Sequence, residues 1–138
     1  MSMKWADSLI RIAKHEVETL QKRVAEITGR RIAAEQRLEA MHREAEQEAE
    51  RARTDPDAGW YHAGYMKGWR VMREKLAQQI AALTAEEAGA RDALSQAFEE
   101  LKKFEHVAEV ARIAEAKEVA KRESAAMDEM GLRLASGR

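Results

Sequence analysis

The residues of this sequence that could do chemistry are its histidines and its many carboxylates, because it contains no cysteine. None of the histidines lies in a His-Glu-x-x-His motif. His42 and Glu46 have a spacing that could hold a metal ion but that usually marks a surface pair. The carboxylates occur throughout the chain, so their pairing does not indicate acid–base catalysis. We predict no catalytic, cofactor or metal site at the four histidines, His15, His42, His62 and His106, and expect the protein not to be an enzyme.

Other common classes of site are also missing from the sequence. The glycines at 59, 64 and 68 lack the preceding strand and the following Lys-Ser/Thr of a phosphate-binding loop. The 24 basic and 25 acidic residues are interleaved, with a net charge of −1, so no basic stripe predicts nucleic-acid binding. No apolar run approaches the roughly 18 residues of a membrane helix. The first seven residues also lack the apolar core of a signal peptide, and we expect a cytoplasmic protein.

The composition indicates long helices. Of the 138 residues, 36% are charged, 5% are aromatic and one is proline, a profile typical of coiled coils. Apolar residues make up 45% of the chain, which is too many for a disordered protein. We therefore expect elements that position side chains along helix faces rather than in a concave active site.

Apolar residues repeat every seven positions along the first part of the chain. Twelve of fourteen positions at alternating steps of four and three are apolar, which indicates a seam against another helix. The polar exceptions are Arg31 and Glu48, and buried polar residues at such positions can fix the register of the pairing. The pattern predicts a helix over about residues 3–53, with seam positions Ala6, Ile10, Ala13, Val17, Leu20, Val24, Ile27, Arg31, Ala34, Leu38, Met41, Ala45, Glu48 and Ala52.

A turn is predicted at residues 54–59, Thr-Asp-Pro-Asp-Ala-Gly. Pro56 removes a backbone donor and disfavours helix at Asp55. Asp55 and Pro56 also suit the N-cap and first position of a new helix. A second helix is predicted over about residues 60–131, ending at Gly131. Its seam has Glu87 as the one polar member and comprises Trp69, Met72, Leu76, Ile80, Leu83, Glu87, Ala90, Leu94, Ala97, Leu101, Phe104, Ala108 and Ala111.

Folding the chain at this turn gives the predicted fold class. It is all-α, a long antiparallel two-helix coiled coil that forms a single hairpin domain over residues 1–138. At 1.5 Å per residue the helices span roughly 75 Å and 110 Å. The C-terminal helix should therefore extend beyond the N-terminus by about twenty residues, starting near Ala111.

The apolar face changes position where this overhang begins. The old register would place mostly charged residues in the seam, whereas a register shifted by two residues, roughly 200° around the helix, is apolar except at Glu123. An apolar stripe without a partner in its own chain predicts a partner in another chain. Frayed-end residues at Met127 and Met130 are the simpler alternative. The predicted surface consists of Ile113, Ala116, Ala120, Met127 and Met130 with the flanking cations Lys117, Lys121 and Arg122.

A cluster of aromatic residues follows the turn. Trp60, Tyr61, Tyr65 and Trp69 could fill the core opposite the alanines of the first helix. They could equally bind a partner at the tip of the hairpin, since Trp and Tyr are favoured anchors of protein interfaces. Both readings remain open from the sequence.

The C-terminal part of the chain resembles the flagellar export protein FliJ family. The resemblance lies in Lys103-Phe104-Glu105-His106-Val107, in Lys121-Arg122-Glu123 and in Met127-Asp128-Glu129-Met130. The chain length and the longer second helix also match, so the resemblance covers essentially the whole chain.

The resemblance implies a non-enzymatic stalk of the type III export ATPase. Such a protein docks in the hexameric ATPase ring by the end that bears both termini, which makes the overhang residues the ATPase-binding surface. It also contacts the cytoplasmic part of the export gate and binds export chaperones. The implied location is cytoplasmic, peripheral at the inner-membrane base of the flagellum, with the membrane reached only through the gate. A helical-hairpin chaperone or scaffold without an ATPase partner is the alternative.

Overall fold

The computed structural model describes residues 4–137 and contains three helices. They are α1 (Lys4–Thr54), α2 (Pro56–Gly59) and α3 (His62–Ser136). No strand occurs in this range. The two long helices pack against each other, which confirms the predicted all-α fold class. The predicted start of the first helix at residue 3 lies outside the described residues.

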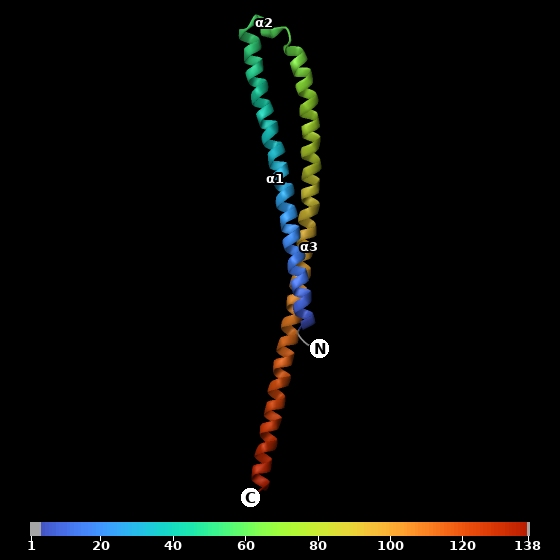
Figure 1. Cartoon of the computed structure of the whole chain (residues 1–138), viewed down its shortest axis with the longest axis vertical. Helices are drawn as coiled ribbons and strands as arrows, with labels where there is room; N and C mark the ends of the chain where they lie inside the picture. Colours follow the sequence, from blue (N-terminus) through green and yellow to red (C-terminus); the bar gives the residue numbers. More distant parts are fainter. Residues whose placement is uncertain (1–3, 138) are drawn as a thin grey trace. The chain divides into compact units, whose positions relative to one another are not determined.

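The chain divides into two compact units. The hairpin unit comprises residues 19–94, and the terminal unit comprises residues 4–18 and 95–137 of the described range. In the hairpin unit, α2 joins α1 to α3, and the two long helices run side by side in opposite directions (Figure 1). In the terminal unit, the beginning of α1 lies beside α3 (Figure 1).

The core of the hairpin unit consists of the predicted seam. Its most buried members are Ile27 of α1, at 2% exposure, and Leu83 of α3, at 3% exposure. Removing such side chains from water supplies most of the packing energy of a two-helix structure. The cluster comprises Val24, Ile27, Ala34, Leu76, Leu83 and Ala90, with Leu38, Met41, Ile80 and Leu94 packed against it.

The terminal unit has a smaller core with the same seam periodicity. Three of its five buried residues are alanines, and small side chains allow the two helices to approach closely. The last buried residue of α3 is Ala108. The five are Ala6, Ala13, Val17, Leu101 and Ala108.

The turn forms as its residue types predict, with one addition. Asp55 is the N-cap of α2, and its side chain accepts a hydrogen bond of 3.0 Å from the amide of Asp57. Pro56 occupies the first helical position, where no amide donor is needed. The new helix ends after four residues, and α3 begins only at His62 rather than at residue 60.

The end of α3 differs from the prediction. The helix passes through Gly131 and continues to Ser136. Gly131 does not adopt the positive φ of a glycine C-cap. A glycine inside a helix costs about 1 kcal/mol relative to alanine, and a single residue of this kind does not stop a helix whose neighbours favour it.

Two of the three polar exceptions of the predicted seams, Arg31 and Glu87, meet in the hairpin unit. The third, Glu48, is half-buried and accepts a hydrogen bond of 2.8 Å from Arg51 of its own helix. The Arg31 guanidinium donates a hydrogen bond of 3.1 Å to the Glu87 carboxylate, which also accepts one of 2.6 Å from the Thr28 hydroxyl. The Glu87 side chain is only 13% exposed. The contact favours one register of α1 against α3, because a shift by one heptad would remove both hydrogen bonds from α1 and leave this carboxylate only its 3.8 Å pair with Arg91 of α3.

Glu87 should make the free energy of unfolding fall as the solution becomes acidic. The hydrogen bond from Thr28, and then the one from Arg31, lower the pKa of Glu87 in spite of its partial burial. Because the pKa of Glu87 is lower in the folded chain than in the unfolded chain, where it is about 4.3, ionised Glu87 stabilises the fold at pH values above about 4.3. This stabilisation is lost as the pH falls through the folded-state pKa. Below about pH 4.3 the melting temperature of the wild type should therefore fall more steeply than that of Glu87→Gln.

Thermal unfolding followed by circular dichroism from pH 6 to 3 measures this difference. Glu26→Gln, at an exposed position of the same unit, is the control and should follow the wild-type profile. Parallel profiles for Glu87→Gln and the wild type would show that this carboxylate does not contribute.

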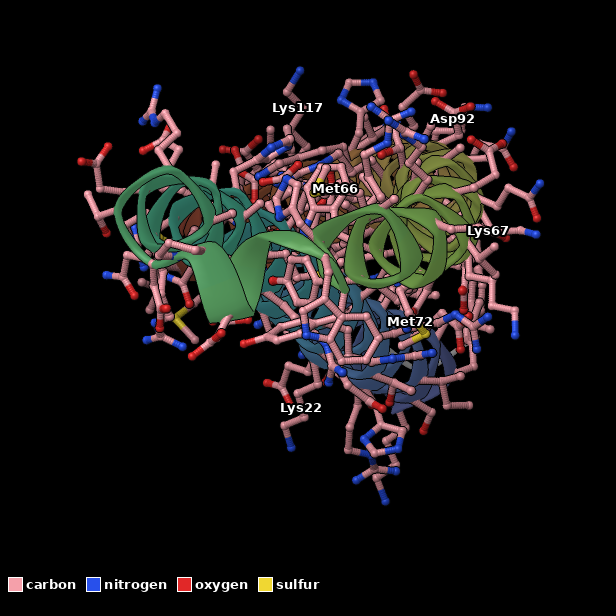
Figure 2. The ribbon with its side chains drawn as sticks, turned by 90° about the horizontal axis from the view of Figure 1, so that it is seen from above. Lys22, Met66, Lys67, Met72, Asp92 and Lys117 are labelled. Atoms are coloured by element: carbon pink, nitrogen blue, oxygen red, sulfur yellow. The ribbon has the colours of Figure 1, made fainter. Side chains whose placement is uncertain are left out.

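The charged side chains form the outer surface. Lys22, Lys67 and Lys117 each extend away from the ribbon (Figure 2). Across residues 4–137, no helix is both long and apolar enough to cross a membrane.

Candidate functional site

The last 26 described residues of the chain, 112–137, are all exposed. They belong to the terminal unit and continue α3 beyond its last contact with α1. This confirms an overhang beginning near Ala111, which is itself half-buried. A helix of this length that packs on nothing in its own chain depends on a partner, or on local pairs, for its stability.

The predicted apolar stripe lies along one face of this overhang. Ile113, Ala116, Ala120 and Met127 follow each other at steps of three, four and seven residues, which return to the same side of an α-helix. Ile113 is 41% exposed and Met127 is 74% exposed. Met130 lies about 60° further around the helix and forms an edge of the stripe.

An exposed leucine that was not predicted from the sequence extends this surface. Leu134 is 69% exposed and lies seven residues after Met127, on the same helix face. Leu132 is also 70% exposed, but it is two residues before Leu134, about 200° around the helix, and does not belong to this surface. The heptad step from Met127 was the signal that could have found Leu134, but a helix predicted to end at 131 excluded it. We call Ile113, Ala116, Ala120, Met127, Met130 and Leu134 the C-terminal stripe.

The three predicted cations do not have equivalent positions. Lys117 and Lys121 lie on one side of the stripe, and no ion pair of either occurs in the described part of α3. Arg122 lies nine residues after Ile113, about half a turn around the helix. Its guanidinium is 3.8 Å from the Glu118 carboxylate. Lys117 lies about 90° from the middle of the stripe, whereas Lys121 and Arg122 each lie about 130° from it. Lys117 is thus the best placed of the three to meet acidic groups of a partner bound at the stripe.

The aromatic cluster of the hairpin unit separates into two pairs. Trp60 is 81% exposed and Tyr61 is 45% exposed. Their rings meet edge to face at 5.6 Å. Both residues lie between α2 and α3. We call Trp60 and Tyr61 the aromatic tip.

Tyr65 and Trp69 are half-buried and belong to the packing of α3 on α1. The Trp69 indole donates a hydrogen bond of 2.9 Å to the Met41 carbonyl oxygen. Its ring meets the His42 ring at 5.2 Å, and the Arg73 guanidinium lies 5.6 Å from its centre. His42 is thereby an aromatic packing partner. Tyr65 stacks with His62 at 6.2 Å. For Trp69 the core-filling interpretation is the one that matches these contacts.

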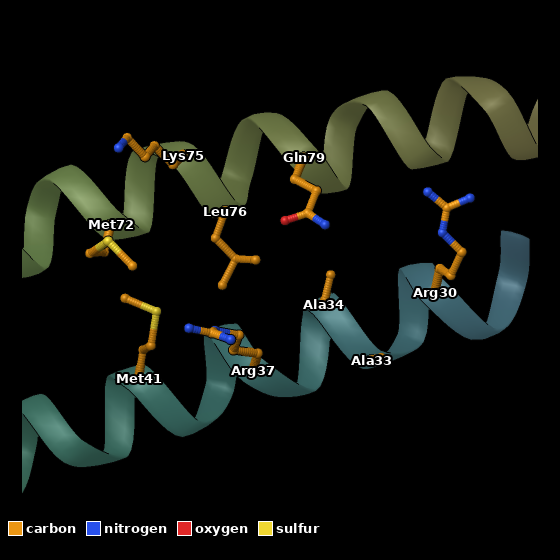
Figure 3. Close-up of a pocket in the computed structure, with 9 residues that line it drawn as sticks. All are labelled: Arg30, Ala33, Ala34, Arg37, Met41, Met72, Lys75, Leu76 and Gln79. Atoms are coloured by element: carbon orange, nitrogen blue, oxygen red, sulfur yellow. The ribbon is translucent and has the colours of Figure 1, made fainter.

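A groove runs between α1 and α3 in the hairpin unit. Its larger part has a volume of about 590 Å³ and is shown in Figure 3. Leu76 of α3 points toward Ala34 of α1 there, and Met72 points toward Met41 (Figure 3). Three cations, Arg30, Arg37 and Lys75, line this larger part of the groove, and no carboxylate lines it.

A second hollow of about 450 Å³ shares Arg37, Met41 and Met72 with the first and is also lined by Tyr65 and Trp69. The groove therefore begins beside the aromatic cluster. Met72, the one exposed member of the predicted seams, lies at 47% exposure in its wall. Flexible methionines beside cations suit the binding of another protein.

The described residues contain no group of three or more His, Cys, Asp or Glu that could hold a metal ion. What the structure presents is a set of exposed apolar surfaces on helices, and such surfaces serve protein recognition.

The chain is similar to flagellar proteins along nearly its whole length. A family model described as flagellar FliJ protein matches residues 6–138. The flagellar FliJ protein of Caulobacter vibrioides strain NA1000 / CB15N is 58% identical over 133 residues, which is 96% of each chain. The protein of the same name from strain ATCC 19089 / CIP 103742 / CB 15 has the same identity and coverage. No solved structure matches the chain significantly.

Proposed function

The chain belongs to the flagellar FliJ protein family, and from this premise we propose that it is a stalk of the flagellar type III export apparatus. In this role it docks in the hexameric export ATPase, stimulates it, and links it to the export gate and to export chaperones. It acts without catalysing a reaction itself. It works in the cytoplasm at the inner-membrane base of the flagellum and meets the membrane only through the gate.

The observation that carries this proposal is the exposed C-terminal stripe. Single exposed apolar residues are ordinary, but a row of them along one helix face marks a binding surface. The interior of a protein ring would cover such a helix from all sides. The ATPase-binding residues are then Ile113, Ala116, Lys117, Ala120, Lys121, Arg122, Met127 and Met130, with Leu134 as an addition from the structure.

The coupling is allosteric. A single helical shaft inside a ring of identical subunits contacts those subunits unequally. Unequal contacts favour different conformations in different subunits, and a ligand shifts an equilibrium by its difference in affinity for the two states. Stimulation of ATP hydrolysis follows if the favoured conformation limits turnover in the free ring.

ATPase turnover in the presence of the purified chain tests the function. We expect the chain to raise the turnover of its cognate export ATPase in a saturable way, and to have no turnover alone. A chain that binds export chaperones but leaves the ATPase unchanged would favour a helical-hairpin chaperone or scaffold without an ATPase partner. The two outcomes separate the proposal from its alternative.

The aromatic tip is the proposed contact with the cytoplasmic part of the export gate. Trp60 presents more of its surface than any other large apolar residue among those described. Tyr65 and Trp69 continue this surface into the groove. Aromatic residues often dominate the binding energy of an interface because they bury a large area at low entropic cost.

Replacing Trp60 and Tyr61 together by alanine should weaken gate binding about tenfold or more, since truncating one such anchor often costs 2 kcal/mol or more. The melting temperature and ATPase stimulation should stay near wild type, because both rings are exposed. Isothermal titration with the soluble part of the gate measures the effect. The control is Phe98→Ala, which removes a ring of 41% exposure from the terminal unit and should leave gate binding intact. Full-strength binding by the double variant would show that the tip is not the gate contact.

A further inference from the structure

A second groove lies on the terminal unit, between the beginning of α1 and the facing part of α3. Its volume is about 280 Å³. Leu9, Ile12 and Glu16 line it from α1, and Ala97, Glu100 and Phe104 line it from α3. Ile12 is 65% exposed, an unusual position for an isoleucine in a helix that already packs against another.

The apolar surface continues beyond this groove on both helices. Trp5 lies four residues before Leu9, and Val107 lies three residues after Phe104, so each falls on the same helix face as its neighbour. Trp5 is 40% exposed and Val107 is 48% exposed. The face is therefore longer than the groove itself and runs for about three turns of α1, roughly 16 Å.

The charges at the groove have one sign. Glu16 and Glu100 are the only charged residues that line it, and both are exposed. Neither forms an ion pair with a residue of the described range 4–137. The larger part of the groove on the hairpin unit has the opposite sign, since its charged residues are Arg30, Arg37 and Lys75, so the two surfaces suit different partners.

We propose that this acidic groove binds a basic amphipathic helix of a partner protein. A third helix fits the depression between two packed helices, with apolar residues at steps of three and four meeting Leu9, Ile12 and Phe104. Lysine or arginine residues on its flanks reach Glu16 and Glu100, which favours basic partners over acidic ones. The inference rests on the terminal unit alone and does not depend on ATPase docking.

The probe for this site is a fluorescein-labelled synthetic helix of leucine and lysine, with leucines at steps of three and four. Its counterpart carries glutamate in place of every lysine. Fluorescence anisotropy with the full chain should show binding of the lysine peptide and weak binding or none of the glutamate peptide. Glu16→Lys with Glu100→Lys should weaken binding of the lysine peptide about tenfold or more.

The matched control is Glu26→Lys with Asp92→Lys, which changes the net charge equally at exposed positions of the hairpin unit. It should alter the affinity by no more than about twofold, since distant exposed charges are largely screened at physiological salt. Equal weakening in both double variants would overturn the proposal, as would absence of binding by the wild-type chain.

Ile12→Glu separates docking in the groove from general charge attraction. The variant adds a negative charge, so attraction alone would strengthen binding of the lysine peptide. Docking requires the apolar contact, so the proposal expects weaker binding. The high exposure of Ile12 keeps the fold intact, and circular dichroism verifies this. Unchanged or tighter binding by Ile12→Glu would overturn the proposal.

Discussion

Replacing Ile113 and Met127 together by aspartate is expected to reduce stimulation of the export ATPase about tenfold or more. The change would place two charges in an interface from which water is excluded, where an unpaired charge is costly. A loss of only ~1.4 kcal/mol of docking free energy already lowers the affinity tenfold. ATPase turnover measured against increasing concentrations of the variant gives the effect.

The fold of this variant should remain close to wild type, because neither residue lies in the core and both are exposed. The control is Ala114→Asp with Ala125→Asp, which adds the same charges to the side of the helix away from the C-terminal stripe. It should stimulate the ATPase nearly as well as the wild type. Normal stimulation by Ile113→Asp with Met127→Asp would show that the docking surface lies elsewhere and would favour the scaffold alternative.

Leu83→Ala is expected to destabilise the fold by about 2–5 kcal/mol, the usual cost of removing a buried leucine side chain. Leu83 is 3% exposed in the core of the hairpin unit. A two-helix structure has little other core with which to fill the cavity. The melting temperature from circular dichroism should fall by at least several degrees.

Met127→Ala is the matched control, since it also shortens a large apolar side chain. Met127 is 74% exposed, so the melting temperature should hardly change. Ile27→Ala, at 2% exposure, should resemble Leu83→Ala. Equal losses at Leu83 and Met127 would mean that the overhang packs on its own chain, which would contradict the exposure of residues 112–137.

The heptad pattern alone determined which residues form the core. Apart from Ala58 in the turn, every buried residue of the described range, from Ala6 to Ala108, occupies a predicted seam position. This succeeds because a helix has only one face that can meet a partner helix, and the period of the apolar residues identifies that face. The turn was predictable for a similar reason, since Asp55 and Pro56 act through their own backbone geometry.

The C-terminal stripe was also predictable, because its register differs from that of the seam. The length of the stripe was not predictable from the sequence. Whether Gly131 ends the helix depends on small differences between backbone conformations, and a glycine fits both a C-cap and a helix interior. Only the structure carried α3 to Ser136 and so brought Leu134 onto the stripe.

The tertiary structure alone decided the roles of the aromatic and polar residues. Four aromatic residues within ten positions have the same chemistry, yet Trp69 bonds to the Met41 carbonyl oxygen while Trp60 points to solvent. Arg31 and Glu87 each interrupt a seam, and their pairing depends on the register of two segments 56 residues apart. Local pattern determines which face of a helix is buried, but contacts between distant segments depend on how those faces meet in space.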